Sequence, residues 1–149
     1  MSTQIHISTD KQELDVAMIH RFLSQEAYWS LGIPLATVEA AIAGSMCFGM
    51  YLDGRQIAFA RLITDAATFA YLCDVFVLPE QRGRGYGQQL VQYIMQQPVV
   101  QGLRRLVLVT RDAHELYRPL GFAELTQPEG YMELRRPNIY RRQATSTDS

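Results

Sequence analysis

Several residue types and patterns that would point to particular functions are scarce in this chain of 149 residues. No apolar run approaches the ~18 residues that cross a bilayer, so the sequence predicts no membrane span and no membrane partner. Lys11 is the only lysine, which excludes the GK[ST] ending of a nucleotide-binding P-loop. The formal net charge is only -1, so the overall charge gives no indication of a nucleic-acid partner.

Cysteine is equally scarce, because Cys47 and Cys73 are the only two. Both lie inside apolar runs without CxxC spacing, and no secretory hydrophobic region precedes them at the N-terminus. We therefore expect reduced core thiols in a cytoplasmic protein, and we expect no metal site. The 48% of hydrophobic residues suits one globular domain. We place this single domain at residues 3–135 and expect a disordered polar tail at residues 141–149.

One glycine-rich stretch organises the rest of the chain. An apolar strand ends at Pro79, and the chain then passes through Arg82-Gly83-Arg84-Gly85-Tyr86-Gly87 into a helical pattern. Glycines let a ligand approach the backbone closely, and the N–H groups of a first helical turn have no partners inside the helix. Because the helix dipole also favours negative charge there, this stretch predicts a site for a phosphate or pyrophosphate.

The remaining elements are predicted from apolar periodicity and turn residues. A capping-box spacing from Thr9 to Gln12 predicts the start of the first helix, and Asp53-Gly54 predicts a tight hairpin. The predicted elements are, in chain order, a strand at 5–8, helices from Thr9 to about Ser24 and from Pro34 to Gly44, strands at 46–52, 56–63 and 69–78, a helix ending at Pro98, a strand at 106–109, a short helix at 113–120, and closing strands at 123–126 and 131–134.

The order of these elements predicts the fold class. Three neighbouring strands with short links imply an antiparallel meander, whereas the strand, helix and strand that follow form one βαβ unit with a parallel pair. The expected fold is therefore α/β (α+β), with a mixed, mostly antiparallel central sheet flanked by helices. A Rossmann site is disfavoured, since the glycines read GxGxG after a meander instead of GxGxxG in a first βαβ unit.

The sequence resembles the Gcn5-related N-acetyltransferase (GNAT) family. The turn matches the family signature R/Q-x-x-G-x-G/A at a strand–helix junction, and Tyr117-Arg118-Pro119-Leu120-Gly121-Phe122 matches the family's tyrosine shortly before a Gly-Phe pair. The resemblance covers residues 3 to 135 and includes the order of elements. It implies an acetyl-CoA-dependent N-acetyltransferase that transfers acetyl directly from the CoA thioester to an acceptor primary amine.

The resemblance also implies how acetyl-CoA is held. The backbone of the glycine turn is expected to bind the pyrophosphate, and the strand before it is expected to splay from its parallel neighbour and pair with the pantetheine arm. Arg82 and Arg84 are either charge-assisted contacts or merely solvated. The implied CoA-binding residues are Val75, Phe76, Val77, Arg82, Gly83, Arg84, Gly85, Tyr86, Gly87 and Gln88.

Tyr117 is the predicted general acid, because a phenol near the thioester sulfur can protonate the departing CoA thiolate. The alternative is a packing tyrosine whose hydroxyl is satisfied locally. Asp74, which interrupts an apolar run, is the candidate general base, and His114 is a second candidate. Asp112 is expected to cap the short helix that carries Tyr117.

The acceptor side is less defined by the sequence. Tyr28, Trp29 and Tyr71, with Phe69 and Tyr131, are candidate pocket residues, although core packing accounts for each equally well. Small amines, amino acids, aminoglycosides, peptide N-termini and protein lysines all remain open as acceptors. Two rival functions are a non-catalytic acyl-CoA-binding or regulatory module of the same fold and an acyltransferase that uses a longer acyl group. A homodimer is the default expectation for oligomeric state.

Overall fold

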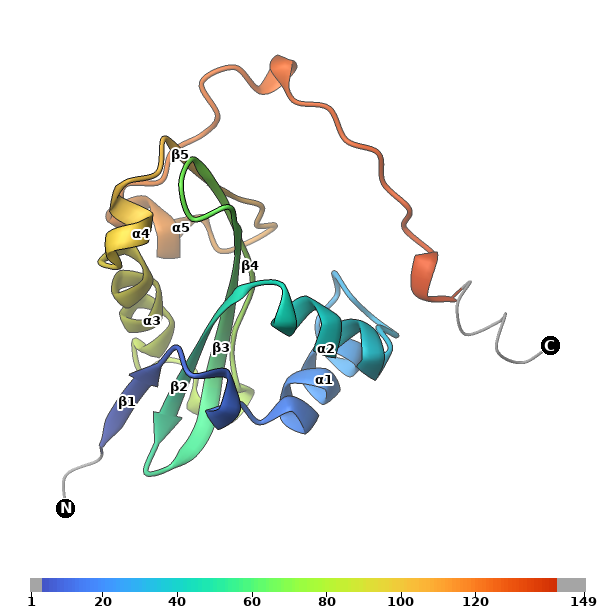
Figure 1. Cartoon of the computed structure of the whole chain (residues 1–149), viewed down its shortest axis with the longest axis vertical. Helices are drawn as coiled ribbons and strands as arrows, with labels where there is room; N and C mark the ends of the chain where they lie inside the picture. Colours follow the sequence, from blue (N-terminus) through green and yellow to red (C-terminus); the bar gives the residue numbers. More distant parts are fainter. Residues whose placement is uncertain (1–3, 142–149) are drawn as a thin grey trace.

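The computed structural model describes residues 4–141 and contains one five-stranded sheet (Figure 1). The strands lie in the order β1-β2-β3-β4-β5, and all neighbours are antiparallel except the parallel pair of β4 and β5. Their bounds are β1 (Ile5–Ser8), β2 (Met46–Leu52), β3 (Arg55–Thr64), β4 (Phe69–Val77) and β5 (Arg105–Leu108). The predicted fold class is confirmed.

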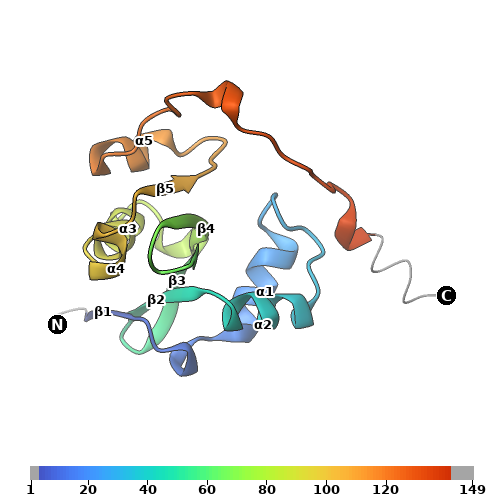
Figure 2. The same cartoon turned by 45° about the horizontal axis from the view of Figure 1, so that its top comes forward.

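Helices cover both faces of the sheet, giving three layers (Figures 1 and 2). α3 buries Leu90, Val91 and Ile94 on one face. On the other face, Phe22 of α1 stacks on Phe76 of β4 with ring centroids 3.9 Å apart. The helices and 3-10 turns are η1 (Lys11–Glu13), α1 (Val16–Gln25), α2 (Leu35–Ala43), η2 (Pro79–Gln81), α3 (Tyr86–Met95), α4 (Pro98–Gln101), α5 (His114–Tyr117), η3 (Arg118–Leu120) and η4 (Pro128–Gly130).

The first helix begins later than the sequence predicts, and the capping box from Thr9 to Gln12 is wrong. Two aspartates act as caps instead. The Asp10 carboxylate accepts the Gln12 backbone N–H at 2.9 Å and starts η1, and the Asp15 carboxylate accepts the Met18 N–H at 3.1 Å and starts α1. Aspartate is a stronger N-cap residue than threonine. Asp15 therefore defines where the long helix α1 begins.

The segment after α5 departs furthest from the prediction. Closing strands are predicted at residues 123–126 and 131–134, but the structure has no strand in either range. The chain instead leaves the sheet beside β5 and runs toward the side of α1 and α2 (Figures 1 and 2). Residues 121–141 are called the arch. Arg105 holds its middle, donating from Nη1 to the Tyr131 hydroxyl at 2.5 Å, and Tyr140 packs against the core beneath α1 and α2.

Two apolar side chains that alternate along this arch do not pack on any other part of the described chain. Met132 is 97% exposed and Leu134 is 81% exposed, so neither packs on the chain's own sheet. A pattern of period two indicates a strand only where a neighbouring strand supplies backbone partners. The predicted strands are therefore wrong for this chain by itself, because β5 pairs with β4 alone in residues 4–141.

Two further expectations concern the chain's relation to membranes and its end. In the described part of the chain, no helix combines the length and the apolar character needed to cross a bilayer. Of the predicted disordered tail at residues 141–149, all but Arg141 lies outside the described residues.

Candidate active site

The glycine turn connects β4 to α3 and leaves a row of backbone donors free. Gly83 and Gly85 have φ angles of +80° and +82°, a left-handed conformation that glycine adopts without steric cost. Gly85 is the N-cap of α3. Within residues 4–141, no protein hydrogen bond uses the backbone N–H groups from Gly83 to Gln88. Unpaired N–H groups at the positive end of a helix favour an anion.

Both arginines of the turn contact residues that come just before it. Arg82 donates from Nε to the carbonyl of Val77 at 3.0 Å, and Arg84 donates from Nη1 to the side-chain oxygen of Gln81 at 3.4 Å. Each guanidinium retains further N–H donors beyond the one used here. Of the two, Arg82 lines the same cleft as the glycine turn.

The parallel pair of strands separates just before this turn. β4 pairs with β5 only from Phe69 to Leu72, while β4 keeps pairing with β3 as far as Val77. The register between β3 and β4 shifts at the point of separation, and Asp74 there has a φ of +52°. A left-handed non-glycine residue costs about 1–2 kcal/mol, so the bend needs contacts that hold it. Beyond Leu72, one edge of β4 has no strand beside it.

The free edge of β4 and the glycine turn line one cleft of about 520 Å³. The α1–α2 loop forms one wall of it, and the β5–α5 loop together with α5 forms another. Predicted CoA-binding residues that line it are Val75, Phe76, Val77, Arg82, Gly83, Gly85, Tyr86 and Gly87. The side chains of Arg84 and Gln88 lie outside its lining. The other lining residues are Phe22, Glu26, Ala27, Tyr28, Trp29, Gln81, Arg111, Asp112, Ala113, Leu116 and Tyr117.

Tyr117 reaches this cleft from the end of α5. Its ring is 8% exposed and packs edge-to-face on Phe122 with centroids 5.7 Å apart. The hydroxyl makes no hydrogen bond to any residue in the range 4–141, so the alternative of a locally satisfied packing tyrosine has no support in its contacts. Burial, with a smaller contribution from Tyr28, raises the pKa of Tyr117 to about 12. The phenol is therefore protonated at physiological pH and can donate a hydrogen bond.

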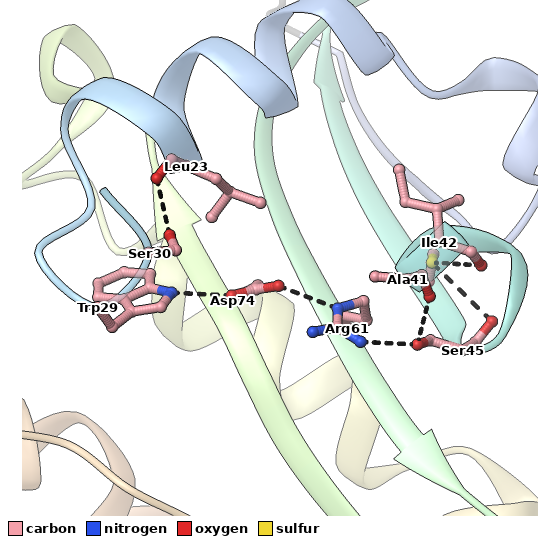
Figure 3. A network of polar contacts seen from close by, with 9 residues as sticks. Leu23, Trp29, Ser30, Ala41, Ile42, Ser45, Arg61 and Asp74 are labelled. Carbon is pink, nitrogen blue, oxygen red and sulfur yellow. Dashed lines mark hydrogen bonds and ion pairs between the residues drawn. The ribbon is translucent and has the colours of Figure 1, made fainter. Parts of the chain in front are cut away.

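Asp74 lies near the cleft but does not line it. Its carboxylate accepts from the indole Nε1 of Trp29 at 2.8 Å and from Nε of Arg61 at 2.9 Å (Figure 3). The Asp74 and Arg61 side chains are only 12% and 15% exposed. Its role as general base stays a prediction, because a base must reach the proton that it removes. His114, the second candidate, lines a separate hollow of about 290 Å³ beside β5.

Asp112 does not cap α5, so that expectation is wrong. The N-cap residue is Ala113, which has no side-chain cap, and its backbone N–H bonds to the hydroxyl of Thr110 at 3.0 Å. Threonine three residues earlier thus takes the local role expected of the aspartate. Asp112 lines the cleft with its neighbours instead.

Only part of the predicted acceptor set reaches the cleft. Tyr28 and Trp29 line it and contact each other edge-to-face with centroids 5.0 Å apart. Tyr71 belongs to the part of β4 that pairs with β5 and is not in the lining. Tyr131 lies further along, in the arch, where it contacts Arg105. The aromatic wall of the cleft is thus the α1–α2 loop.

Two residues that the sequence reasoning missed contribute to this wall. The guanidinium of Arg111 lies 3.7 Å from the ring centroid of Tyr28 and so links the β5–α5 loop to the α1–α2 loop. Glu26 adds a carboxylate to the same lining. An arginine in a loop carries no local signal of such a contact. Arg61, the partner of Asp74, is a third missed residue. Its pairing could have been predicted, because Arg61 and Asp74 each interrupt an apolar strand.

No cluster of three or more His, Cys, Asp or Glu side chains in the described residues is arranged to hold a metal ion. The site is therefore defined by backbone donors, one tyrosine and an aromatic wall. A strand–turn–helix that presents free N–H groups next to a splayed strand is a site for an extended ligand with a phosphate at one end.

This chain belongs to the acetyltransferase (GNAT) family, which matches residues 16–122. A Gibberella zeae protein assigned to the acetyltransferases is 34% identical, with 74% of each chain covered. A crystal structure from Xanthomonas campestris pv. campestris, assigned to the same family, is 54% identical, covers 92% of this chain and 96% of its own, and has a TM-score of 0.89. The resemblance found in the sequence is thus confirmed.

A more distant structure shares the fold alone. The aminoglycoside N-acetyltransferase AAC(6')-Iy in complex with CoA is 21% identical, covers 91% of this chain and 95% of its own, and has a TM-score of 0.61.

Proposed function

We propose that this protein is an acetyl-CoA-dependent N-acetyltransferase that transfers acetyl directly from the thioester to an acceptor primary amine. The observation that carries the proposal is a single cleft containing the unpaired N–H groups of the glycine turn, the free edge of β4 and the unpartnered hydroxyl of Tyr117. These three features suit, in turn, the pyrophosphate, the pantetheine arm and the reacting sulfur of one extended thioester substrate.

Acetyl-CoA is the proposed co-substrate. Its pyrophosphate would bind the N–H groups of Gly83 to Gln88, with Arg82 and Arg84 nearby. Its pantetheine arm would hydrogen-bond the free edge of β4 at Val75, Phe76 and Val77, as an added strand does. The CoA complex of the distant AAC(6')-Iy structure supports this choice of ligand for the fold. We propose no metal cofactor.

Tyr117 is the proposed general acid. An attacking amine converts the thioester carbonyl into a tetrahedral oxyanion, and its collapse breaks the C–S bond. The Tyr117 phenol would donate its hydrogen bond to the departing thiolate sulfur. Because its pKa is raised to about 12, this donor stays protonated across the physiological range. The sequence predicts Asp74 as the general base, but Asp74 is absent from the lining of the cleft.

Direct attack is favoured over a covalent acyl-enzyme because neither cysteine is a good nucleophile. Burial raises the pKa of Cys73 to about 12 and also raises the pKa of Cys47. A thiol needs thiolate character to attack a thioester, and these two stay protonated. Neither cysteine lines the cleft.

The acceptor is proposed to be a small-molecule or peptide amine. It would enter beside Trp29, where the indole face and the carboxylate of Glu26 favour a cationic ammonium group, while Arg111 covers the ring of Tyr28. We further propose that residues 3–135 form one catalytic domain in the cytoplasm, which the two free thiols support. A homodimer is also proposed, because the exposed apolar arch offers a surface that a second copy can cover.

The function is tested by ligand stabilisation and by thiol release. CoA at about 100 times its Kd is expected to raise Tm by about 5–10 °C through mass action, and NAD is expected to leave Tm unchanged. A panel of primary amines with acetyl-CoA should then release free CoA thiol for at least one amine. Equal shifts with NAD would contradict the CoA assignment. CoA binding without thiol release across the panel would favour the non-catalytic rival.

A further inference from the structure

The bend in β4 is held by a chain of polar contacts that the proposed reaction does not use. Of the three non-glycine residues with positive φ in residues 4–141, Asp53 and Ala66 lie in turns, and Asp74 alone lies within a strand. It stands two residues after Leu72, the last residue of β4 that pairs with β5. A strained backbone conformation persists only where surrounding contacts determine it. At Asp74, those contacts come from its own carboxylate.

The contacts connect four separate elements (Figure 3). From the α1–α2 loop, Trp29 donates to Oδ1 of Asp74 at 2.8 Å. From β3, Arg61 donates to Oδ2 at 2.9 Å and, through Nη1, to the hydroxyl of Ser45 at 2.9 Å. Ser45 in turn donates to the carbonyl of Ala41 in α2 at 2.6 Å. Both carboxylate oxygens therefore have a partner, and the guanidinium is anchored on its far side.

This arrangement faces away from the cleft. Asp74 and Arg61 line a small cavity of about 10 Å³ under α1 and α2 and are absent from the lining of the cleft, whereas Trp29, one contact further along, lines the cleft itself. A carboxylate in this position reaches no substrate atom directly. It does contact the indole of Trp29, and it lies beside the register shift that sets which face Val75 and Phe76 present.

We propose that Asp74 is a positioning residue: its carboxylate, held by Arg61, fixes both the acceptor wall at Trp29 and the bend that frees the edge of β4. The two halves of the cleft are thereby held in one geometry by one ion pair. The proposal rests on the proposed function for its kinetic consequences, but its structural content does not depend on the acceptor. It replaces the general-base role for Asp74.

The experiment uses Asp74→Asn in the full chain, with Arg61→Lys and the double variant Asp74→Asn/Arg61→Met as second tests. Asn removes the charge that orders Arg61 and leaves Trp29 only a neutral, weaker acceptor. The double variant leaves no buried charge, so it folds even where a single change leaves one ion unpaired. The matched control is Glu124→Gln, which removes a carboxylate from the exposed pair with Arg118.

Tryptophan fluorescence reports directly on the contact between Asp74 and Trp29, because Trp29 is the chain's only tryptophan. In Asp74→Asn and in the double variant, we expect a red-shifted emission that acrylamide quenches more readily than in wild type. CoA, used as the probe ligand, should bind about 10-fold more weakly, the value of one hydrogen bond to a charged group. Glu124→Gln should match wild type in both measurements. Wild-type emission and wild-type CoA affinity in both Asp74 variants would overturn the proposal.

The pH profile separates positioning from base catalysis. With the amine that gives the fastest thiol release in wild type, Asp74→Asn should raise the KM for that amine and lower kcat without changing the shape of kcat/KM against pH, and Arg61→Lys should do the same. Loss of the acidic limb in Asp74→Asn alone would instead assign Asp74 as the base and overturn the proposal. If wild type releases no thiol with any amine, the proposed function fails, while the fluorescence and CoA measurements still decide this inference.

Discussion

The two sides of the cleft are built from different materials. The proposed donor side is mainly backbone: a left-handed glycine turn, the first N–H groups of α3 and the free edge of β4. The proposed acceptor side is made of side chains on loops, chiefly Tyr28, Trp29 and Arg111. Backbone recognition tolerates many sequences around a few glycines, whereas a side-chain wall changes with each substitution. The difference explains why a specific ligand, acetyl-CoA, can be proposed for the donor side, whereas the acceptor is proposed only as a primary amine.

The strongest way to break the donor side is Gly85→Glu. The position has a φ of +82°, and a Cβ there would meet no atom within 4 Å, so the new carboxylate projects into open space beside the free N–H groups. Repulsion between the carboxylate and pyrophosphate, added to the lost hydrogen bonds, should weaken CoA binding by about 100-fold or more. Isothermal titration with CoA measures this effect.

The matched control for this change is Gly54→Glu in the hairpin between β2 and β3. Gly54 has a similar φ of +87° and equally open space around its Cβ, but it does not line the cleft. Both variants should lose about 1–2 kcal/mol of unfolding free energy from the left-handed strain. Only Gly85→Glu should lose CoA affinity. CoA binding retained by Gly85→Glu would show that the anion site lies elsewhere.

The next effect is expected where the two sides meet, at Tyr117→Phe. Removing the phenol should lower kcat by about 100-fold, the lower end for general acid catalysis, and leave the Kd for CoA nearly unchanged. Because the pKa of Tyr117 is raised to about 12, the donor stays protonated below that pH. The ratio of wild-type to variant kcat should therefore be constant from about pH 6 to 9.

Tyr93→Phe is the control for this substitution, since Tyr93 packs edge-to-face on Phe48 and does not line the cleft. It should keep wild-type kcat. Stopped assays that follow thiol release over the pH range provide the measurement. An unchanged kcat in Tyr117→Phe would remove Tyr117 as the acid and leave the sulfur to solvent.

The same contrast describes what could be predicted from the sequence. The glycine turn and the tyrosine before Gly121-Phe122 are local patterns, so they identified the strand–helix junction and α5 without knowledge of any long-range contact. The separation of β4 from β5 was expected from the resemblance, and the pairing limits are consistent with it. Local chemistry was enough wherever backbone conformation creates the feature.

Features that depend on long-range register could not be read in this way. Asp74 was noticed as a polar interruption of a strand, but its partners lie 13 and 45 residues away. Which side chains meet it depends on a one-residue register shift, and such a shift reverses the face of every later residue. Arg111 and Tyr28 are also far apart in the sequence and meet across the cleft from two different loops. The sequence predicts strands in the arch because apolar and polar residues alternate there. Such alternation does not show whether a neighbouring strand is present to pair with them.

The smallest effect on the donor side is expected from the arch, where Met132→Ser with Leu134→Ser tests the proposed homodimer. Both side chains are almost fully exposed, so their loss should change the stability of one chain by less than about 0.5 kcal/mol. If a second copy covers them, the double variant should sediment as a monomer at concentrations where wild type is a dimer.

The control is Leu35→Ser, at an exposed leucine on α2, which should leave the dimer intact. CoA affinity should stay within about 2-fold of wild type in both variants, since neither the arch nor Leu35 contributes to the donor lining. A wild-type chain that sediments as a monomer at every concentration would contradict the homodimer and leave the arch as an exposed segment of a single chain.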